Sequence, residues 1–437
     1  MWKIVLKHNI PTINPTLEIS RPARENRQLR GWGAVWKHPK TKKINSEALA
    51  PNDLLALKIA SEGSRFKPEK YRRMILPSRV NLLLAKAVNK GLLISPLPKI
   101  KRHGRNLSIP DRLRYADTFT LQWHITNACG LHCRHCYDRT KRSRLALPGG
   151  IKILADLSKF CLKYRVRGHV CFTGGNPFLH PHFQRLYRKA SGYGFSTSIL
   201  GNPVSEHELV KIIDIQMPGY FQVSLEGLAA HNDQIRGKGH FRRTLKFLKT
   251  LRRLNISSAV MLTLTENNIN EVIPLADKLR KYADYFTFNR LSSAGEGAAL
   301  NLPDKKKYAE FLKKYVSKSR QNRIIGFKDN LINIVLKKRK MRLFDGCTGY
   351  GCGAAFNFLA VLSDGEVHAC RKFSSPLGNI FKTRLSKIYE SGAAKRYRRG
   401  AKECAACNIR HACGGCLAAG YSKGIKIFDK RDPYCFY

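Results

Sequence analysis

Three cysteines stand close together in the chain, at Cys129, Cys133 and Cys136. A loop with this spacing can place three thiolates around one face of a 4Fe–4S cluster. Such clusters usually take four cysteine ligands, so a missing fourth ligand leaves one iron open for a substrate or cofactor. A zinc site is the alternative for clustered cysteines. The loop follows a β-rich run directly, and this favours the cluster, because βα barrels place their chemistry at the carboxyl ends of strands.

Eight further cysteines lie between Cys347 and Cys435. Four of them form the run Cys-x2-Cys-x5-Cys-x2-Cys, whose paired Cys-x2-Cys units are typical of metal-binding segments. A zinc ribbon uses four cysteines in this way and is one interpretation of the run. The two remaining cysteines, Cys161 and Cys171, stand apart in apolar segments and are expected to be buried core thiols.

The elements that would position these residues alternate between strands and helices. Strands are expected at 119–126, 169–173, 196–200, 221–225, 258–264 and 285–290. Amphipathic helices are expected between them, at 150–165, 182–192, 206–213, 241–254 and 270–281. Repeated strand–helix–strand units pair their strands in parallel through right-handed crossovers. The pattern predicts an α/β fold with a partial TIM barrel of six such units, (β/α)6.

The residues on either side of the barrel have other patterns. Before it, residues 51–61 and 78–89 are expected to be helices, 91–94 a short strand and 100–108 a linker. After it, the chain is rich in Cys and Gly with few periodic apolar segments, so metal is expected to supply much of the stability. We therefore expect a small N-terminal α+β extension at 1–115, the barrel at 116–320 and a cysteine-rich domain at 340–437.

The Cys-x3-Cys-x2-Cys loop after the first barrel strand resembles that of the radical S-adenosylmethionine (SAM) superfamily. The resemblance implies that Cys129, Cys133 and Cys136 bind a 4Fe–4S cluster whose open iron takes the amino and carboxylate groups of SAM. In that family one electron cleaves the sulfonium, and the resulting 5′-deoxyadenosyl radical removes hydrogen from the substrate.

Further segments resemble the family's SAM-binding parts. Gly174-Gly175-Asn176-Pro177 stands where the family has Gly-Gly-Glu-Pro, and its glycines would let backbone carbonyls approach the SAM amino group. Ser224-Leu225-Glu226-Gly227 resembles the segment near the ribose, and residues 231–241 resemble its continuation. Turn chemistry is an equal explanation for Ser224 and for Asn202. The resemblance implies SAM contacts from His135, Gly174, Gly175, Asn176, Pro177, Asn202, Ser224 and Glu226.

Arg290 ends the sixth expected strand. It is expected either to meet the substrate or the SAM carboxylate, or to form a surface salt bridge.

The C-terminal cysteines resemble the SPASM domain, a twin auxiliary-cluster module found on peptide-modifying radical SAM enzymes. The resemblance assigns one auxiliary 4Fe–4S cluster to Cys347, Cys352, Cys370 and Cys416. It assigns the other to Cys404, Cys407, Cys413 and Cys435. Two residues separate the last two central cysteines, where family members often have three. Full ligation leaves no open iron, so electron transfer and scaffolding are implied, and the expected cofactors are three 4Fe–4S clusters and SAM.

The charge is strongly positive, with 80 Lys and Arg against 30 Asp and Glu, a formal net charge of +50. The excess runs along the whole chain, which favours an acidic peptide or plain solvation over a nucleic-acid partner. No stretch approaches the roughly 20 apolar residues of a membrane span. No signal peptide is expected either, so a cytoplasmic location with reduced thiols is predicted.

These features predict an enzyme: a radical SAM maturase that abstracts hydrogen from a ribosomally synthesised precursor peptide with an acidic leader. A ferredoxin or flavodoxin would donate the electron. The N-terminal extension resembles a winged-helix peptide-recognition element, which takes a leader as an added strand. The whole chain looks closest to maturases of thio/selenoxazole-type (selenobiotic) peptides. The alternatives are a formylglycine-generating sulfatase-maturing enzyme and a basic zinc-ribbon nucleic-acid-binding protein. The latter explains the charge but not the strand-end cysteines.

Overall fold

The fold is seen in a computed structural model of the chain, which describes residues 12–20, 32–37, 44–62, 71, 74–75, 80–94, 99–102, 109 and 111–437. The chain divides into two compact units. The N-terminal unit comprises Met1–Lys99 with two short segments, Cys161–Val166 and Gly192–Gly194. The large unit comprises Ile100–Phe160, Arg167–Ser191 and Phe195–Tyr437. Most of the predicted linker, residues 103–108, lies outside the described residues.

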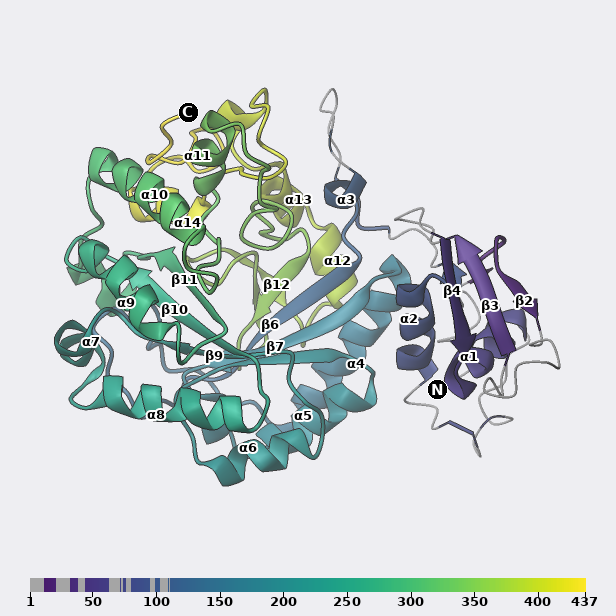
Figure 1. Cartoon of the computed structure of the whole chain (residues 1–437). Coiled ribbons are helices and arrows are strands. Elements are labelled where there is room, and N and C mark those ends of the chain that lie inside the picture. The colour runs from purple at the N-terminus through teal and green to yellow at the C-terminus, as the bar shows by residue number, and fades with distance from the viewer. Residues whose placement is uncertain are drawn as a thin grey trace. The chain divides into compact units, whose positions relative to one another are not determined.

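The large unit is built on a nine-stranded sheet in the order β11-β10-β9-β8-β7-β6-β12-β13-β14. Six consecutive strands are parallel, as predicted. They are β6 (Thr118–Thr126), β7 (Arg167–Gly174), β8 (Ser196–Leu200), β9 (Phe221–Ser224), β10 (Ser258–Leu264) and β11 (Tyr285–Arg290). The helices between them are α4 (Leu147–Tyr164), α5 (Phe183–Gly192), α6 (Glu206–Ile213), α7 (Ala229–Arg236), α8 (His240–Arg253) and α9 (Val272–Leu279). Figure 1 shows α5, α6 and α8 along the outer side of the curved sheet, so the predicted partial barrel is confirmed.

The sheet continues into the cysteine-rich region, which the sequence pattern did not indicate. β12 (Phe358–Val361) pairs in parallel with β6, so that Phe358 lies opposite Thr120. β13 (Glu366–His368) and β14 (Pro376–Asn379) extend the sheet in antiparallel fashion. The prediction of little apolar core after residue 340 is wrong. Fully buried side chains there include Leu359, Val361, Leu362, Val367 and Leu385.

The remaining helices of the large unit are short except for one. They are α3 (Asp111–Arg114), α10 (Lys305–Ser319), α11 (Ile332–Lys338), α12 (Leu385–Glu390), α13 (Gly392–Arg399) and α14 (Leu417–Ser422). Four single turns of 3-10 helix lie at Pro177–Leu179, Ile269–Glu271, Gly295–Ala299 and Lys402–Cys404. Cys161 and Cys171 are both buried, as predicted.

The N-terminal unit is a small α+β fold. β2 (Glu18–Ser20), β3 (Trp32–Lys37) and β4 (Ile44–Leu49) form an antiparallel sheet, and β1 (Thr12–Ile13) pairs with β5 (Leu93–Ile94). α1 (Pro51–Glu62) and α2 (Val80–Lys90) confirm the two predicted helices, and only β5 of the strands was predicted. The apolar core of this unit contains Trp36, Leu49, Ile59 and Leu84. In the described part of the whole chain, we find no helix with the length and apolar character that a membrane crossing requires.

Candidate functional site: a cysteine loop at the strand ends

The cysteine loop begins where β6 ends, and its three thiols are each partly buried. The loop folds back on itself, because the Cys136 N–H donates to the Cys133 carbonyl at 3.1 Å and the Leu131 N–H donates to the Cys129 Sγ at 3.4 Å. The Asn127 side-chain amide donates to the Thr140 carbonyl at 2.7 Å and ties the start of the loop to its far side. The loop therefore holds its thiols in a fixed arrangement at the carboxyl edge of the sheet.

The Gly-Gly-Asn-Pro turn at the end of β7 packs directly on this loop. The Gly175 N–H donates to the Thr126 carbonyl and the Asn176 N–H to the Ala128 carbonyl, both at 2.8 Å. A Cβ on Gly174 would lie 2.1 Å from the Thr126 carbonyl oxygen, and one on Gly175 would lie 2.2 Å from that of Ala128. Gly174 also has φ +134°, which side chains rarely adopt. The protein's own backbone therefore requires both glycines, in addition to any role in approaching SAM.

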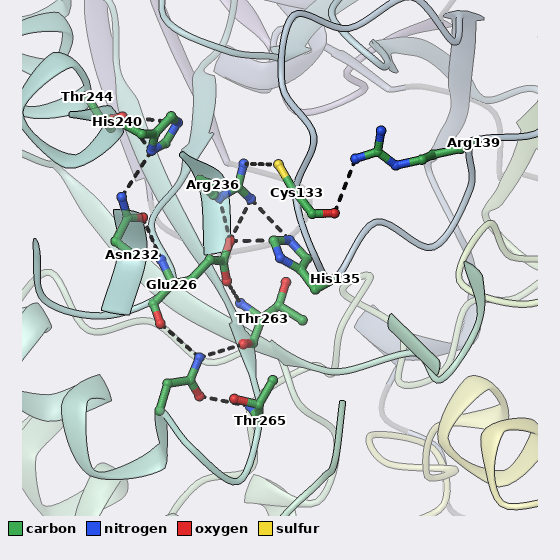
Figure 2. Close-up of polar contacts among 11 residues, drawn as sticks. Cys133, His135, Arg139, Glu226, Asn232, Arg236, His240, Thr244, Thr263 and Thr265 are labelled. Carbon is green, nitrogen blue, oxygen red and sulfur yellow. Dashed lines mark hydrogen bonds and ion pairs between the residues drawn. The ribbon is translucent and has the colours of Figure 1, made fainter. Parts of the chain in front are cut away.

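Two of the three thiols receive a hydrogen bond from a side chain outside the loop. The Asn202 amide, just beyond β8, donates to the Cys129 Sγ at 3.3 Å. The Arg236 guanidinium, at the end of α7, donates through Nη1 to the Cys133 Sγ at 3.7 Å, as Figure 2 shows. Asn202 was predicted as a SAM contact, and in the structure its side chain is hydrogen-bonded to the Cys129 thiol. Arg236 belongs to the quoted 231–241 segment, but it was not predicted as a site residue.

Arg236 is held by Glu226, which is only 1% exposed. Arg236 Nε donates to Glu226 Oε1 at 2.8 Å, and the Thr263 N–H donates to Glu226 Oε2 at 2.7 Å (Figure 2). Both carboxylate oxygens thus have protein donors. Burial raises the pKa of Glu226, but the charge of Arg236 and the hydrogen bonds from Arg236 and the Thr263 N–H act against it, and this pKa lies below its ordinary value. The proposed contact of Glu226 with SAM stays a prediction, and in this structure Glu226 positions Arg236.

His135 completes this network inside the cysteine loop. Its Nε2 lies 3.3 Å from Arg236 Nη2, and burial lowers the pKa of His135 to about 4. The imidazole is therefore neutral near pH 7 and accepts a hydrogen bond from Arg236. Its Nδ1 is buried without a partner among the described residues, and the same holds for Asn176 Oδ1. Ser224, the last residue of β9, is partly buried and Pro177 is buried.

The donor chemistry of this site fits a 4Fe–4S cluster with SAM beside it. Three cysteines on one loop supply the thiolates. The buried polar atoms His135 Nδ1 and Asn176 Oδ1, which have no partner among the described residues, could hydrogen-bond to a polar ligand. No three His, Cys, Asp or Glu side chains in the described ranges converge closely enough to hold a single metal ion. A 4Fe–4S cluster binds each thiolate through a different iron atom, so its ligands do not meet at one point.

A segment after β11 closes the other side of the cysteine loop, and the sequence pattern did not indicate it. The Glu296 N–H donates to the Cys136 carbonyl at 2.9 Å. Gly295 has φ +55°, and a Cβ there would lie 2.7 Å from the Cys136 carbonyl oxygen. The turn of 3-10 helix at Gly295–Ala299 therefore packs against the backbone of the loop.

Arg290, at the end of β11, has neither of the roles expected for it. Its side chain is fully buried between two carboxylates. Nε donates to Asp329 at 2.7 Å, and the two terminal nitrogens donate to Asp432 at 2.9 and 2.6 Å. Asp432 also accepts the Cys416 N–H at 2.9 Å. Arg290 therefore joins the barrel to the last cysteines of the chain, and sequence reasoning missed this because its partners lie 39 and 142 residues away.

The eight C-terminal cysteines fall into two groups. Burial raises the pKa of Cys370 to about 12, with Cys416 and Cys347 adding to the increase. Burial also raises the pKa of Cys352, and Cys347, Cys416 and Cys370 add to it. The four cysteines assigned to the first auxiliary cluster, Cys416 included, are thus near enough to influence one another electrostatically. Asn330 bridges this group to the neighbouring segment, since it accepts the Cys347 N–H at 2.8 Å and donates to the Gly415 carbonyl at 2.7 Å.

The second group surrounds a pocket near the C-terminus. Its lining includes the four cysteines assigned to the second auxiliary cluster, Cys404, Cys407, Cys413 and Cys435. Burial raises the pKa of Cys404 to about 11, and Cys407 and Cys435 add to the increase. No cysteine of the first group lines this pocket. The two groups adjoin each other, since the Cys352 N–H donates to the Cys413 carbonyl at 3.1 Å. The assignment of these cysteines to two clusters stays a prediction.

Comparisons with known families agree with the site. The model of the radical SAM superfamily matches residues 123–279, and that of the SPASM iron–sulfur cluster-binding domain matches residues 352–413. The chain therefore contains a radical SAM domain followed by a SPASM domain, and it is an enzyme.

Individual relatives are more distant. The AdoMet-dependent heme synthase of Methanosarcina barkeri is 24% identical over 72% of this chain and 96% of the relative. The mycofactocin maturase MftC of Mycolicibacterium smegmatis is 26% identical over 78% of this chain and 87% of the relative. The solved structure of Streptococcus suis SuiB bound to precursor peptide SuiA is 18% identical, has a TM-score of 0.60, and covers 98% of this chain and 100% of SuiB. The last likeness shows the fold.

Proposed function

We propose that this protein is a peptide maturase that modifies a ribosomally synthesised precursor peptide by abstracting a hydrogen atom from it. The observation that carries the proposal is the fold shared with peptide-bound SuiB over 98% of the chain, which includes the N-terminal unit as well as the barrel and the cysteine-rich region. The match to the maturase MftC supports the same class of substrate.

The cofactors that we propose are SAM and three 4Fe–4S clusters. The clusters would be held by the cysteine loop, by Cys347, Cys352, Cys370 and Cys416, and by Cys404, Cys407, Cys413 and Cys435. SAM on the cluster of the loop supplies a 5′-deoxyadenosyl radical when one electron is provided, for which a ferredoxin or flavodoxin is suited. These thiols need a reducing compartment, and we therefore propose a cytoplasmic location.

The chain's own residues fix the cysteine loop in place and orient a positive charge toward one of its thiols. The two glycines of the Gly-Gly-Asn-Pro turn fix the loop against β6, and Glu226 keeps Arg236 directed at the Cys133 thiol. The unpartnered His135 Nδ1–H is suited to donate a hydrogen bond to a ring nitrogen of the SAM adenine, and the unpartnered Asn176 Oδ1 is suited to accept one from the SAM amino group.

The N-terminal unit is proposed to recognise the leader of the peptide. In the described part of the sheet β2-β3-β4, β4 has a neighbouring strand on one side only. An extended peptide can pair with such an edge through main-chain hydrogen bonds. A chain with a net charge of +50 would favour an acidic leader.

The test is peptide affinity measured by fluorescence anisotropy at several salt concentrations, on the full chain and on a protein lacking residues 1–99. The candidate peptides are those encoded beside the gene. Truncation should weaken binding by at least tenfold while 5′-deoxyadenosine formation without peptide stays nearly intact, and binding should fall as salt rises. Salt-independent binding that survives truncation would contradict leader recognition by this unit.

A tetrapyrrole substrate is the second candidate, favoured by the match to the heme synthase of Methanosarcina barkeri. Adding porphyrin in place of peptide distinguishes the two, because only the true substrate should be altered as 5′-deoxyadenosine accumulates. The same assay with a sulfatase-derived peptide tests formylglycine formation. The thio/selenoxazole-type subclass stays a prediction, which mass spectrometry of the modified peptide would test.

A further inference from the structure

The three thiols of the cysteine loop do not have equivalent surroundings. Cys129 faces the neutral amide of Asn202, whereas Cys133 faces the cationic guanidinium of Arg236. The Cys136 thiol itself donates to the Asp138 carbonyl at 3.4 Å. Among the hydrogen bonds in the described ranges, Arg236 thus makes the one that brings a full positive charge to a thiol of this loop.

The position of Arg236 is set by a buried carboxylate that is itself locked in place. The Glu226 N–H donates to Asn232 Oδ1 at 3.1 Å, and the Glu226 carbonyl accepts from Asn268 Nδ2 at 2.9 Å. The side chains of Arg236 and Glu226 are 9% and 2% exposed. Figure 2 shows the guanidinium between the carboxylate and the Cys133 sulfur. A charge pair buried in this way acts on its surroundings with little screening by water or salt.

We propose that Arg236 and Glu226 set the reduction potential of the cluster at the cysteine loop, and that they act in opposite directions. The inference rests on the proposed cluster. Reduction by one electron makes the cluster and its thiolates more negative. The Arg236 cation favours that state and raises the potential, while the Glu226 anion disfavours it and lowers the potential. Hydrogen bonds and charges near the sulfurs are among the features that set such potentials.

A second arginine near the same cysteine provides a matched control. Arg139 donates through Nη2 to the Cys133 carbonyl oxygen at 3.4 Å, not to the sulfur. Its side chain is 32% exposed. Solvent therefore screens the charge of Arg139, and removing it should change the potential far less than removing Arg236.

The experiment is an anaerobic redox titration, followed by electron paramagnetic resonance, of the reconstituted full chain without SAM. The proteins are wild type, R236Q, R236K, E226Q and R139Q. The variant with Cys129, Cys133 and Cys136 all changed to Ala identifies which signal belongs to the loop. R236Q should disfavour one-electron reduction about tenfold or more, which lowers the potential by about 59 mV or more. E226Q should shift the potential upward, while R236K and R139Q should stay near wild type.

Equal potentials in R236Q, E226Q and wild type, or shifts of the same sign in R236Q and E226Q, would overturn the proposal. If R236Q loses its cluster, the potentials of E226Q and R236K decide the question. A higher potential in E226Q together with an unchanged potential in R236K supports the proposal, and any other result contradicts it. A failure of the proposed cluster assignment has a different signature, because the triple cysteine variant would then lose no signal at all. A failure of the proposed peptide substrate would leave all of these potentials unchanged.

Discussion

The thiols of the cysteine loop and those of the C-terminal region receive their hydrogen bonds from different parts of the protein. In the loop, the side chains of Asn202 and Arg236 donate to two thiols, in addition to the backbone N–H of Leu131 on the Cys129 Sγ. In the C-terminal groups, the donors to thiols in the described structure are backbone N–H groups, such as that of Gly415 on the Cys413 Sγ at 3.4 Å. Backbone N–H groups at Gly353, Ala354 and Lys372 serve the first C-terminal group.

This difference indicates two ways of controlling an iron–sulfur cluster. A backbone donor is fixed by the fold and does not depend on which side chain its residue carries. Its effect on a cluster therefore changes little when side chains are substituted. A side-chain donor depends on one residue and can bring a full charge. The loop at the strand ends, where chemistry is expected, adds side-chain donors to its backbone donor. The C-terminal groups, for which electron transfer is proposed, use the fixed kind.

The largest expected effect comes from removing the loop thiols. Changing Cys129, Cys133 and Cys136 together to Ala should leave about eight of twelve irons and abolish 5′-deoxyadenosine formation, because the open iron is lost. Iron analysis and chromatography of the SAM products measure both. Persistent 5′-deoxyadenosine in this variant would show that the loop is not the SAM site.

The next effect concerns the attachment of the C-terminal region. R290Q leaves Asp329 and Asp432 without their cation in a buried site, and breaking such a pair typically costs about 3–5 kcal/mol. The denaturation midpoint of the large unit should fall accordingly. The control is R167Q, which breaks the exposed pair with Asp117 and should cost less than about 1 kcal/mol. Equal midpoints for the two variants would mean that Arg290 joins nothing of importance.

A more local effect is expected from Cys404 and Cys407. Replacing both with Ala removes two proposed ligands from the pocket near the C-terminus. Proteolysis should then cut within residues 400–437, while β12 and the barrel resist it, because β12 belongs to the barrel sheet and has its own buried core. Cleavage that spreads into residues 350–380 at the same rate would show that metal supports the whole region.

The smallest expected effect comes from the side-chain donor to Cys129. N202A removes a neutral hydrogen bond to the Cys129 sulfur. The potential of the loop cluster should fall by less than in R236Q, by under about 59 mV, because a dipole acts more weakly than a full charge. A larger shift in N202A than in R236Q would place control of the potential at Cys129.

The sequence predicted the parts whose signals are local. The six parallel strands carry apolar runs, and the ligand candidates carry close cysteine spacing, so both could be placed by pattern. β12 was missed because it has four residues and its partner β6 lies more than 200 residues earlier in the chain. Arg236 was missed because an arginine at the end of a polar helix is normally expected to be exposed to solvent. Its one available signal was its place in the segment that follows Glu226.

The most direct test of the account uses a precursor peptide deuterated at its carbon-bound hydrogens. The reconstituted enzyme, SAM, a one-electron reductant and this peptide are incubated without oxygen, and the 5′-deoxyadenosine is analysed by mass spectrometry. The account predicts that deuterium passes from the peptide into 5′-deoxyadenosine as the mass of the peptide changes. Formation of 5′-deoxyadenosine without deuterium, beside a peptide of unchanged mass, would contradict hydrogen abstraction from a peptide by this enzyme.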